Sequence, residues 1–176
     1  MTIDSDLKMD SDRTSGADGS VGSEQRASLD RPVVPFSIAG ALDLGRSYWS
    51  EVERSTVGLV RLREELGGLE LRVFGRGPTL LRFGDPQLEA DAARVVCCYP
   101  IEGGALVRRR GGSISFEQTT GDGLELRSTI TAFHPRLAAK PGAPHWTGTL
   151  YNQIQSRIHE AIGRRYFTYL QQQPKQ

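Results

Sequence analysis

The chain of 176 residues is 38% hydrophobic and 24% charged, a balance that suits one ordinary domain with a sizeable core. Its formal net charge of +1 argues against a nucleic-acid groove, which normally carries a concentrated basic face. The longest strongly apolar run, Val95–Tyr99, is far shorter than the roughly 20 residues that span a bilayer, and the Asp-rich start lacks the apolar segment of a secretory signal, so we expect a cytoplasmic protein without a membrane span.

Residues 1–31 differ from the rest of the chain in composition. They contain four basic and seven acidic residues, a net charge of −3, so the remainder carries +4 of the overall +1. Asp, Ser and Gly dominate and apolar residues occur singly, so this segment cannot bury enough surface to offset its ordering entropy. We predict an acidic disordered tail over residues 1–31 that folding does not require, a single domain over residues 32–172, and a disordered end over residues 173–176.

The first ordered elements are predicted over residues 32–66. Residues 33–38 are β-prone, and the proline inside them favours an edge strand. Asp43 is a candidate helix N-cap. The apolar residues that follow it recur at helical spacing and predict a short amphipathic helix: Leu44, Tyr48, Trp49 and Val52. Residues 57–66 fit either a helical turn or a strand, and we favour a helical turn followed by irregular chain.

From residue 69 onward the hydrophobic pattern has a period of two. It predicts strands over residues 69–73, 79–83, 91–101, 105–109, 113–117 and 124–133. Most of the intervening segments contain glycine pairs or Gly-Asp-Gly, which are typical of hairpin turns, so neighbouring strands are expected to pair antiparallel. Cys97 and Cys98 are adjacent and match neither a zinc site nor a disulfide framework, and we interpret them as buried free thiols.

A long helix is predicted over residues 146–170, after a proline-punctuated loop. Its apolar residues recur at steps of three and four, so one face must lie on a flat apolar surface. About 25 residues at a rise of 1.5 Å span ~37 Å, comparable with the width of six or seven strands. We therefore predict an α+β fold in which a curved antiparallel sheet of about six or seven strands wraps around the long C-terminal helix, with a cavity between the two.

This order of elements resembles the helix-grip fold of the START and polyketide-cyclase-like superfamily. Trp49 on the early helix and the stretch "LYNQIQSRIHEAIGRRYFTYL", residues 150–170, are in keeping with it. The resemblance covers roughly residues 33–170 and rests on the order of elements, without a diagnostic motif. It implies a cavity for a hydrophobic ligand, and it transfers no catalytic residue.

Few polar groups carry a recognisable chemistry. The run Arg108–Arg110 fits a clamp for a carboxylate or phosphate, and equally a solvated strand end that discourages edge pairing. The histidines His134, His145 and His159 lack metal-binding spacing. No phosphate loop, nucleophile elbow or H-E-x-x-H motif occurs. We predict no catalytic residue, no metal and no cofactor.

Three functions stay open. The first is a module that binds a small apolar or amphipathic ligand between sheet and terminal helix, without nucleic acid as a partner. The residues predicted to line that site are Tyr99, Phe116, Leu126, Ile130, Ile154, Ile158 and His159. The second is a cyclase- or hydratase-type enzyme in the same cavity, with Tyr99, Glu102 or His159 as polar candidates. The third is an interaction protein that uses the outer sheet face, because residues 95–99 are apolar on both faces. A homodimer is left open.

Overall fold

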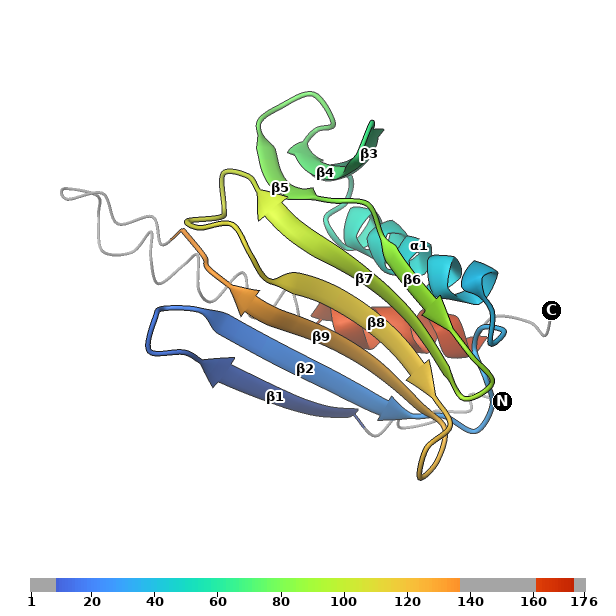
Figure 1. Ribbon diagram of the computed structural model, residues 1–176. Helices are drawn as coiled ribbons and strands as arrows, with labels where there is room; N and C mark the ends of the chain where they lie inside the picture. The colour runs from blue at the N-terminus through green and yellow to red at the C-terminus, as the bar shows by residue number, and fades with distance from the viewer. Residues whose placement is uncertain (1–8, 137–160, 173–176) are drawn as a thin grey trace.

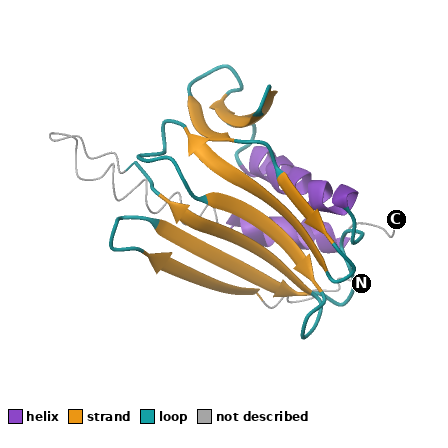
Figure 2. Cartoon of the chain, in the orientation of Figure 1, coloured by secondary structure: helices purple, strands orange, loops and turns teal. Residues whose placement is uncertain are grey.

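A computed structural model describes residues 9–136 and 161–172 of the chain. These residues form one antiparallel sheet, and both helical segments lie on the same face of it (Figures 1 and 2). The strands in chain order are β1 (Met9–Ser15), β2 (Val21–Ser28), β3 (Val60–Glu65), β4 (Gly68–Val73), β5 (Thr79–Phe83), β6 (Gln87–Ala90), β7 (Arg94–Gly103), β8 (Ser113–Thr119) and β9 (Glu125–Phe133). The helix α1 (Ile38–Ser55) precedes β3, and residues 161–172 are helical.

The order across the sheet is β1-β2-β9-β8-β7-β5-β4-β3, and β6 pairs with β7 beside β5. β2, which precedes α1, thus lies next to β9, the last strand. The terminal helical segment packs on one face of this part of the sheet (Figure 1), where Tyr166 contacts Phe116 of β8. This arrangement confirms the α+β helix-grip fold predicted from the sequence, with nine strands in the described residues instead of six or seven. The part of the predicted helix at residues 146–160 lies outside the described residues, as does the end at residues 173–176.

The prediction of a disordered tail is wrong for the described residues 9–31. β1 and β2 form a hairpin, and β2 pairs with β9 through partners such as Ala27 and Leu126. Composition missed the hairpin because a strand needs only alternate residues to be buried. Gln25, Ala27 and Leu29 are buried at such alternate positions, while the residues between them are exposed. The edge of β9 supplies the backbone hydrogen bonds that the segment cannot provide for itself.

Two predicted features before residue 60 are also wrong. α1 begins at Ile38 with Ser37 as its N-cap, whose side chain accepts a hydrogen bond from Gly40 N at 3.2 Å, so Asp43 lies inside the helix. Residues 33–38 form no strand. The buried side chain of Gln118 on β8 instead bonds Val33 N, Val34 N and Val34 O at 2.7–3.2 Å, and this satisfies the backbone without a ladder.

Three further boundaries differ from the prediction. Residues 60–65 form strand β3, because they pair antiparallel with β4 along their whole length, from Val60–Val73 to Glu65–Gly68. The long strand predicted over residues 91–101 begins only at Arg94, after a turn in which the Asp91 side chain accepts from Ala93 N and Arg94 N. Residues 105–109 form a loop with a single bridge, Val107–Pro135. The remaining predicted strands are confirmed as β4, β5, β8 and β9.

An aromatic cluster fills the space between the sheet, α1 and the terminal helical segment. The ring of Tyr48 on α1 packs against Phe116 of β8 with centroids 4.4 Å apart, and meets the Tyr166 ring edge to face at 5.4 Å. Tyr166 Oη donates a hydrogen bond to Leu44 O at 3.1 Å, which ties the terminal helix to α1. The Arg54 guanidinium lies 4.8 Å from the centre of the Tyr169 ring and joins the same two helical segments.

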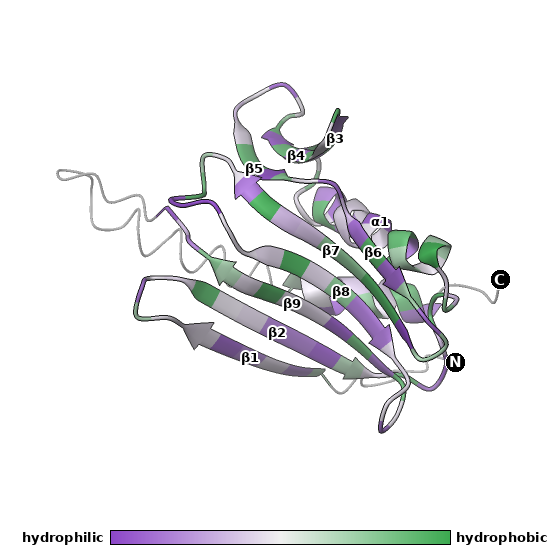
Figure 3. Cartoon of the chain, viewed as in Figure 1, coloured by the Kyte–Doolittle hydropathy of each residue, from purple (hydrophilic) through white to green (hydrophobic). Residues whose placement is uncertain are grey.

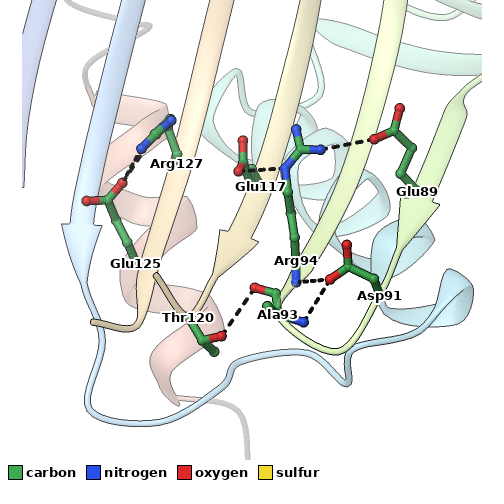
Figure 4. A network of polar contacts seen from close by, with 8 residues as sticks. All are labelled: Glu89, Asp91, Ala93, Arg94, Glu117, Thr120, Glu125 and Arg127. Carbon is green, nitrogen blue, oxygen red and sulfur yellow. Dashed lines mark hydrogen bonds and ion pairs between the residues drawn. The ribbon is translucent and has the colours of Figure 1, made fainter. Parts of the chain in front are cut away.

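The opposite face of the sheet is polar. Arg94 on β7 bonds Glu89 on β6 and Glu117 on β8, at 3.0 and 2.9 Å, and Arg127 bonds Glu125 on β9 (Figure 4). Hydrophilic and hydrophobic residues alternate along these central strands (Figure 3). Val96 pairs with Glu89 and Glu117 in the ladders and is only 6% exposed, so charged neighbours cover this outward apolar residue.

Candidate functional site

The structure contains a cleft of about 360 Å³ between α1 and the three-strand lobe, our name for β3, β4 and β5. β7 forms its floor. Its lining residues are Leu42, Arg46, Trp49, Ser50, Glu53, Leu62, Glu64, Glu65, Gly68, Leu69, Asp85, Pro86 and Tyr99. The volume lies near the lower end of the range of about 300–1,000 Å³ that is typical of small-molecule sites.

The inner wall of the cleft is apolar and aromatic. Trp49 of α1 and Tyr99 of β7 are 3% and 4% exposed, and their rings meet edge to face with centroids 5.4 Å apart. Leu62 and Leu69 complete the wall from the lobe side. Burial raises the pKa of the Tyr99 hydroxyl above its ordinary value, so the group is a neutral donor or acceptor at physiological pH.

A glycine sets the distance between the two sides of this wall. A methyl group at Gly45 of α1 would lie 2.6 Å from Tyr99 Oη and 2.8 Å from Cys97 Sγ, closer than side chains approach one another. The absence of a side chain therefore lets α1 lie directly on β7. This close packing fixes the position of Trp49, one helical turn further along, at the edge of the cleft.

The rim of the cleft is polar and mostly acidic. Glu53 of α1 accepts a hydrogen bond from Leu62 N at 2.7 Å, which joins the helix to the outer edge of β3. Glu64 and Asp85 are exposed on the rim, and among the described residues Arg46 is the one basic residue in the lining. An apolar wall with a charged rim can hold a molecule that has both an apolar body and a polar group.

The predicted ligand-lining residues fall into three groups. Tyr99 lines the cleft. Phe116 and Leu126 are completely buried in the aromatic core, and Ile130 is partly buried against it. Ile154, Ile158 and His159 lie outside the described residues. The structure thus brings Tyr99 and Phe116 into one aromatic cluster, and of the described candidates it places only Tyr99 at a cleft.

Sequence reasoning missed most of the cleft. Ser50 and Glu53 lie one turn apart on α1. Leu62 pairs with Leu71 across the β3–β4 hairpin, and Leu69 lies diagonally opposite Leu62, two residues nearer the turn. The interpretation of residues 57–66 as irregular chain hid this second wall. The spacing of Leu62 and Leu69 about a Gly-Gly turn was the available signal, since it is typical of a hairpin.

The adjacent cysteines are free and differ in environment. Cys97 faces the core and is fully buried, whereas Cys98 on the outward face is partly exposed. Burial raises the pKa of the Cys97 thiol to about 11, so this thiol is protonated near neutral pH and is a poor nucleophile. Within residues 9–136 and 161–172, no cluster of His, Cys, Asp and Glu has the arrangement of a metal site.

The arginine run lies in the β7–β8 loop, and all three of its side chains are exposed. Arg109 bonds Asp18 in the β1–β2 turn at 3.0 Å and approaches His134 Nε2 to 2.9 Å. Hydrogen bonds from Ser20, followed by the charges of His134 and Arg109, lower the pKa of Asp18 to about 2. This contact joins the N-terminal hairpin to the end of β9.

Comparisons with known proteins assign no family to the chain. No protein-family model matches the chain, and no curated protein matches it. A search of solved structures finds the crystal structure of Ara h 8.0201, at 15% identity and a TM-score of 0.36, over 92% of this chain and 99% of that one. A similarity of this size carries no argument about function. No described helix has the length and apolar content to cross a membrane.

Proposed function

We propose that this helix-grip domain binds a small apolar or amphipathic molecule in the cleft between α1 and the three-strand lobe. The observation that carries the proposal is the cleft of about 360 Å³, in which Trp49, Tyr99, Leu62 and Leu69 form an apolar wall below a charged rim. The space under the terminal helical segment is a weaker candidate, because Phe116 and Leu126 there are fully buried among other side chains.

Saturable binding of the neutral dye Nile red tests the proposal. The dye should bind the folded protein at one site, with a fluorescence increase and a higher melting temperature, because only the folded chain has the cleft. Ser50→Trp fills the cleft from α1 and should weaken binding of the dye by about tenfold or more. Ser47→Trp is the matched control, because Ser47 is a half-buried serine of the same helix outside the cleft.

A third variant separates the two candidate sites. Ile130→Trp adds volume beside the core on β9 and leaves the cleft untouched. Loss of dye binding in Ile130→Trp but not in Ser50→Trp would move the site to the space beneath the terminal helix. Absence of saturable binding in the unmodified protein would end the ligand-binding proposal in both places.

A further inference from the structure

Three large apolar side chains are exposed together at the end of the three-strand lobe. Val57 is 94% exposed, Phe74 is 70% exposed and Leu59 is 51% exposed. Phe74 N donates a hydrogen bond to Leu59 O at 2.8 Å, so the segment before β3 and the β4–β5 turn lie side by side. We call Val57, Leu59 and Phe74 the apolar tip. A contiguous group of this kind on a domain surface commonly marks an interaction site.

The backbone of the apolar tip is strained. Val57 and Phe74 have φ values of 52° and 49°, in the left-handed region that residues other than glycine and asparagine seldom adopt. For a β-branched valine this conformation is especially unfavourable. Val57 N is nevertheless bonded to Arg54 O at 3.1 Å, which holds the turn after α1. At Val57 the left-handed conformation completes the C-terminal cap of α1, in which Gly58 N also donates to Glu53 O at 3.0 Å, and at Phe74 it belongs to the β4–β5 turn. Two exposed apolar side chains thus occupy positions where glycine or asparagine is usual.

The two segments that form the apolar tip are basic. Residues 54–61 and 72–78 contain four arginines and no Asp or Glu. Arg54 and Arg72 are paired with Glu51 and Glu70. Arg61 and Arg76 are exposed and take part in no ion pair among the residues that the structure describes.

A second basic segment lies at the same end of the sheet, further across it. The β7–β8 loop begins where Ala105 N donates to Thr79 O at 2.9 Å, immediately after the β4–β5 turn. Both connections lie at the same end of the sheet (Figure 1). The exposed run Arg108–Arg110 belongs to this loop, and within the described part of the chain only Arg109 forms an ion pair, with Asp18. Arg108 N donates to His134 O and Arg109 pairs with Asp18, so this run lies near the end of β9 and the β1–β2 turn. The end of the domain therefore carries Arg61 and Arg76 beside the apolar tip, and a second group of arginines further across the sheet.

We propose that this end of the domain docks on an anionic lipid bilayer. The arginines match the negative charge of the headgroups, and Val57, Leu59 and Phe74 enter the apolar layer below them. A bilayer surface supplies both environments in the right order, whereas a nucleic acid would leave the two aliphatic side chains without an apolar partner. The site is separate from the ligand cleft, since none of these residues lines it.

Sedimentation with vesicles tests the proposal. The protein should bind vesicles of phosphatidylcholine and phosphatidylserine, bind weakly to phosphatidylcholine alone, and lose affinity as the salt concentration rises. Leu59→Ser with Phe74→Ser, and separately Arg61→Glu with Arg76→Glu, should each weaken binding by about tenfold or more. Leu66→Ser and Arg165→Glu are matched controls, because both residues are exposed elsewhere and should leave binding unchanged.

Val57→Asn distinguishes docking from a structural role. Asparagine tolerates the left-handed conformation, so the variant should raise the melting temperature by about one to a few degrees while it weakens vesicle binding. Ser50→Trp should bind vesicles normally, which keeps this test independent of the ligand-binding proposal. The proposal is overturned if the unmodified protein does not bind anionic vesicles, or if it binds an oligonucleotide through these arginines and no vesicle. It is also overturned if Leu66→Ser weakens vesicle binding as much as the tip variants do.

Discussion

The two sides of β7 are built differently, and the proposals above assign stability to one side and recognition to the other. On one side β8 pairs with β7 from Arg94–Thr119 to Pro100–Ser113. On the other side β5 is joined to β7 only at Arg82–Gly103 and Phe83–Ile101. We call the first side, with β2, β8, β9, α1 and the terminal helical segment, the main half. It contains the aromatic cluster, whereas the three-strand lobe carries the apolar tip and one wall of the cleft.

The contrast follows from what each region buries. In the main half, side chains of both helical segments and the sheet meet in one cluster, and its largest members are completely buried. The lobe contributes fewer buried side chains to that core, Leu69, Leu71 and Phe83. It is also anchored by the bond from Leu62 N to Glu53 and by the pairing of Glu70 with Arg72 and Arg82. Both arginines lower the pKa of Glu70. A region with fewer buried contacts opens more readily and can change shape around a ligand.

Removal of the N-terminal hairpin should have the largest effect, because it breaks the main half. Deletion of residues 1–30 removes the buried Ala27 and Leu29 and leaves the edge of β9 unpaired. We expect loss of cooperative thermal unfolding, since the stability of a whole domain is only about 5–15 kcal/mol. Deletion of residues 1–15 is the control, because β1 is exposed along nearly its whole length. Equal stability of all three proteins would restore the prediction of a dispensable tail.

Substitution of one phenylalanine in the main half and one in the three-strand lobe compares the two regions directly. Phe116→Ala removes a fully buried ring from the aromatic cluster and should cost about 3–5 kcal/mol in the free energy of unfolding. Phe74→Ala removes a ring that is 70% exposed on the lobe, and it should change the free energy of unfolding by no more than about 0.5 kcal/mol. Urea denaturation measures both. A cost for Phe74→Ala close to that for Phe116→Ala would mean that the lobe is as important to folding as the main half.

Two glycine-to-alanine substitutions, one at the contact between α1 and β7 and one elsewhere, test that contact with a smaller change. Gly45→Ala places a methyl group 2.6 Å from Tyr99 Oη and should cost about 1–3 kcal/mol through overpacking. Gly121→Ala adds the same group where no atom lies within 4 Å, and should be nearly neutral. The Gly45→Ala variant should also bind Nile red more weakly, because Tyr99 lines the cleft. Unchanged stability of Gly45→Ala would show that α1 can move away from β7 at little cost.

The smallest expected effect concerns thiol chemistry within the main half. With a pKa of about 11, the Cys97 thiol ionises only as the pH rises toward that value, so at pH 8 only about one thiol in a thousand is thiolate. The folded Cys98→Ser variant should therefore react with a thiol reagent about tenfold or more slowly than folded Cys97→Ser, and both should react quickly in denaturant. Equal native rates would mean that the inner face of β7 is open to solvent.

The sequence by itself determined the elements whose signal is local. The alternation in residues 69–73, 79–83, 113–117 and 124–133 and the glycine turns between them predicted β4, β5, β8 and β9, because period-two burial and turn conformation depend on near neighbours. The order of elements predicted the α+β helix-grip fold. Tyr99 was predicted as a polar group of the ligand site, and the structure places it in the lining of the cleft.

Only the tertiary structure decided the rest, because the deciding interactions join distant parts of the chain. The polar segment that became β2 is ordered by the free edge of β9, and the backbone at residues 33–34 is held by the Gln118 side chain 84 or 85 positions away. The cleft needs α1, the β3–β4 hairpin and β7 together, and the apolar tip needs Leu59 beside Phe74. Neither site leaves a periodic trace in the sequence, since its residues meet only after the sheet has formed.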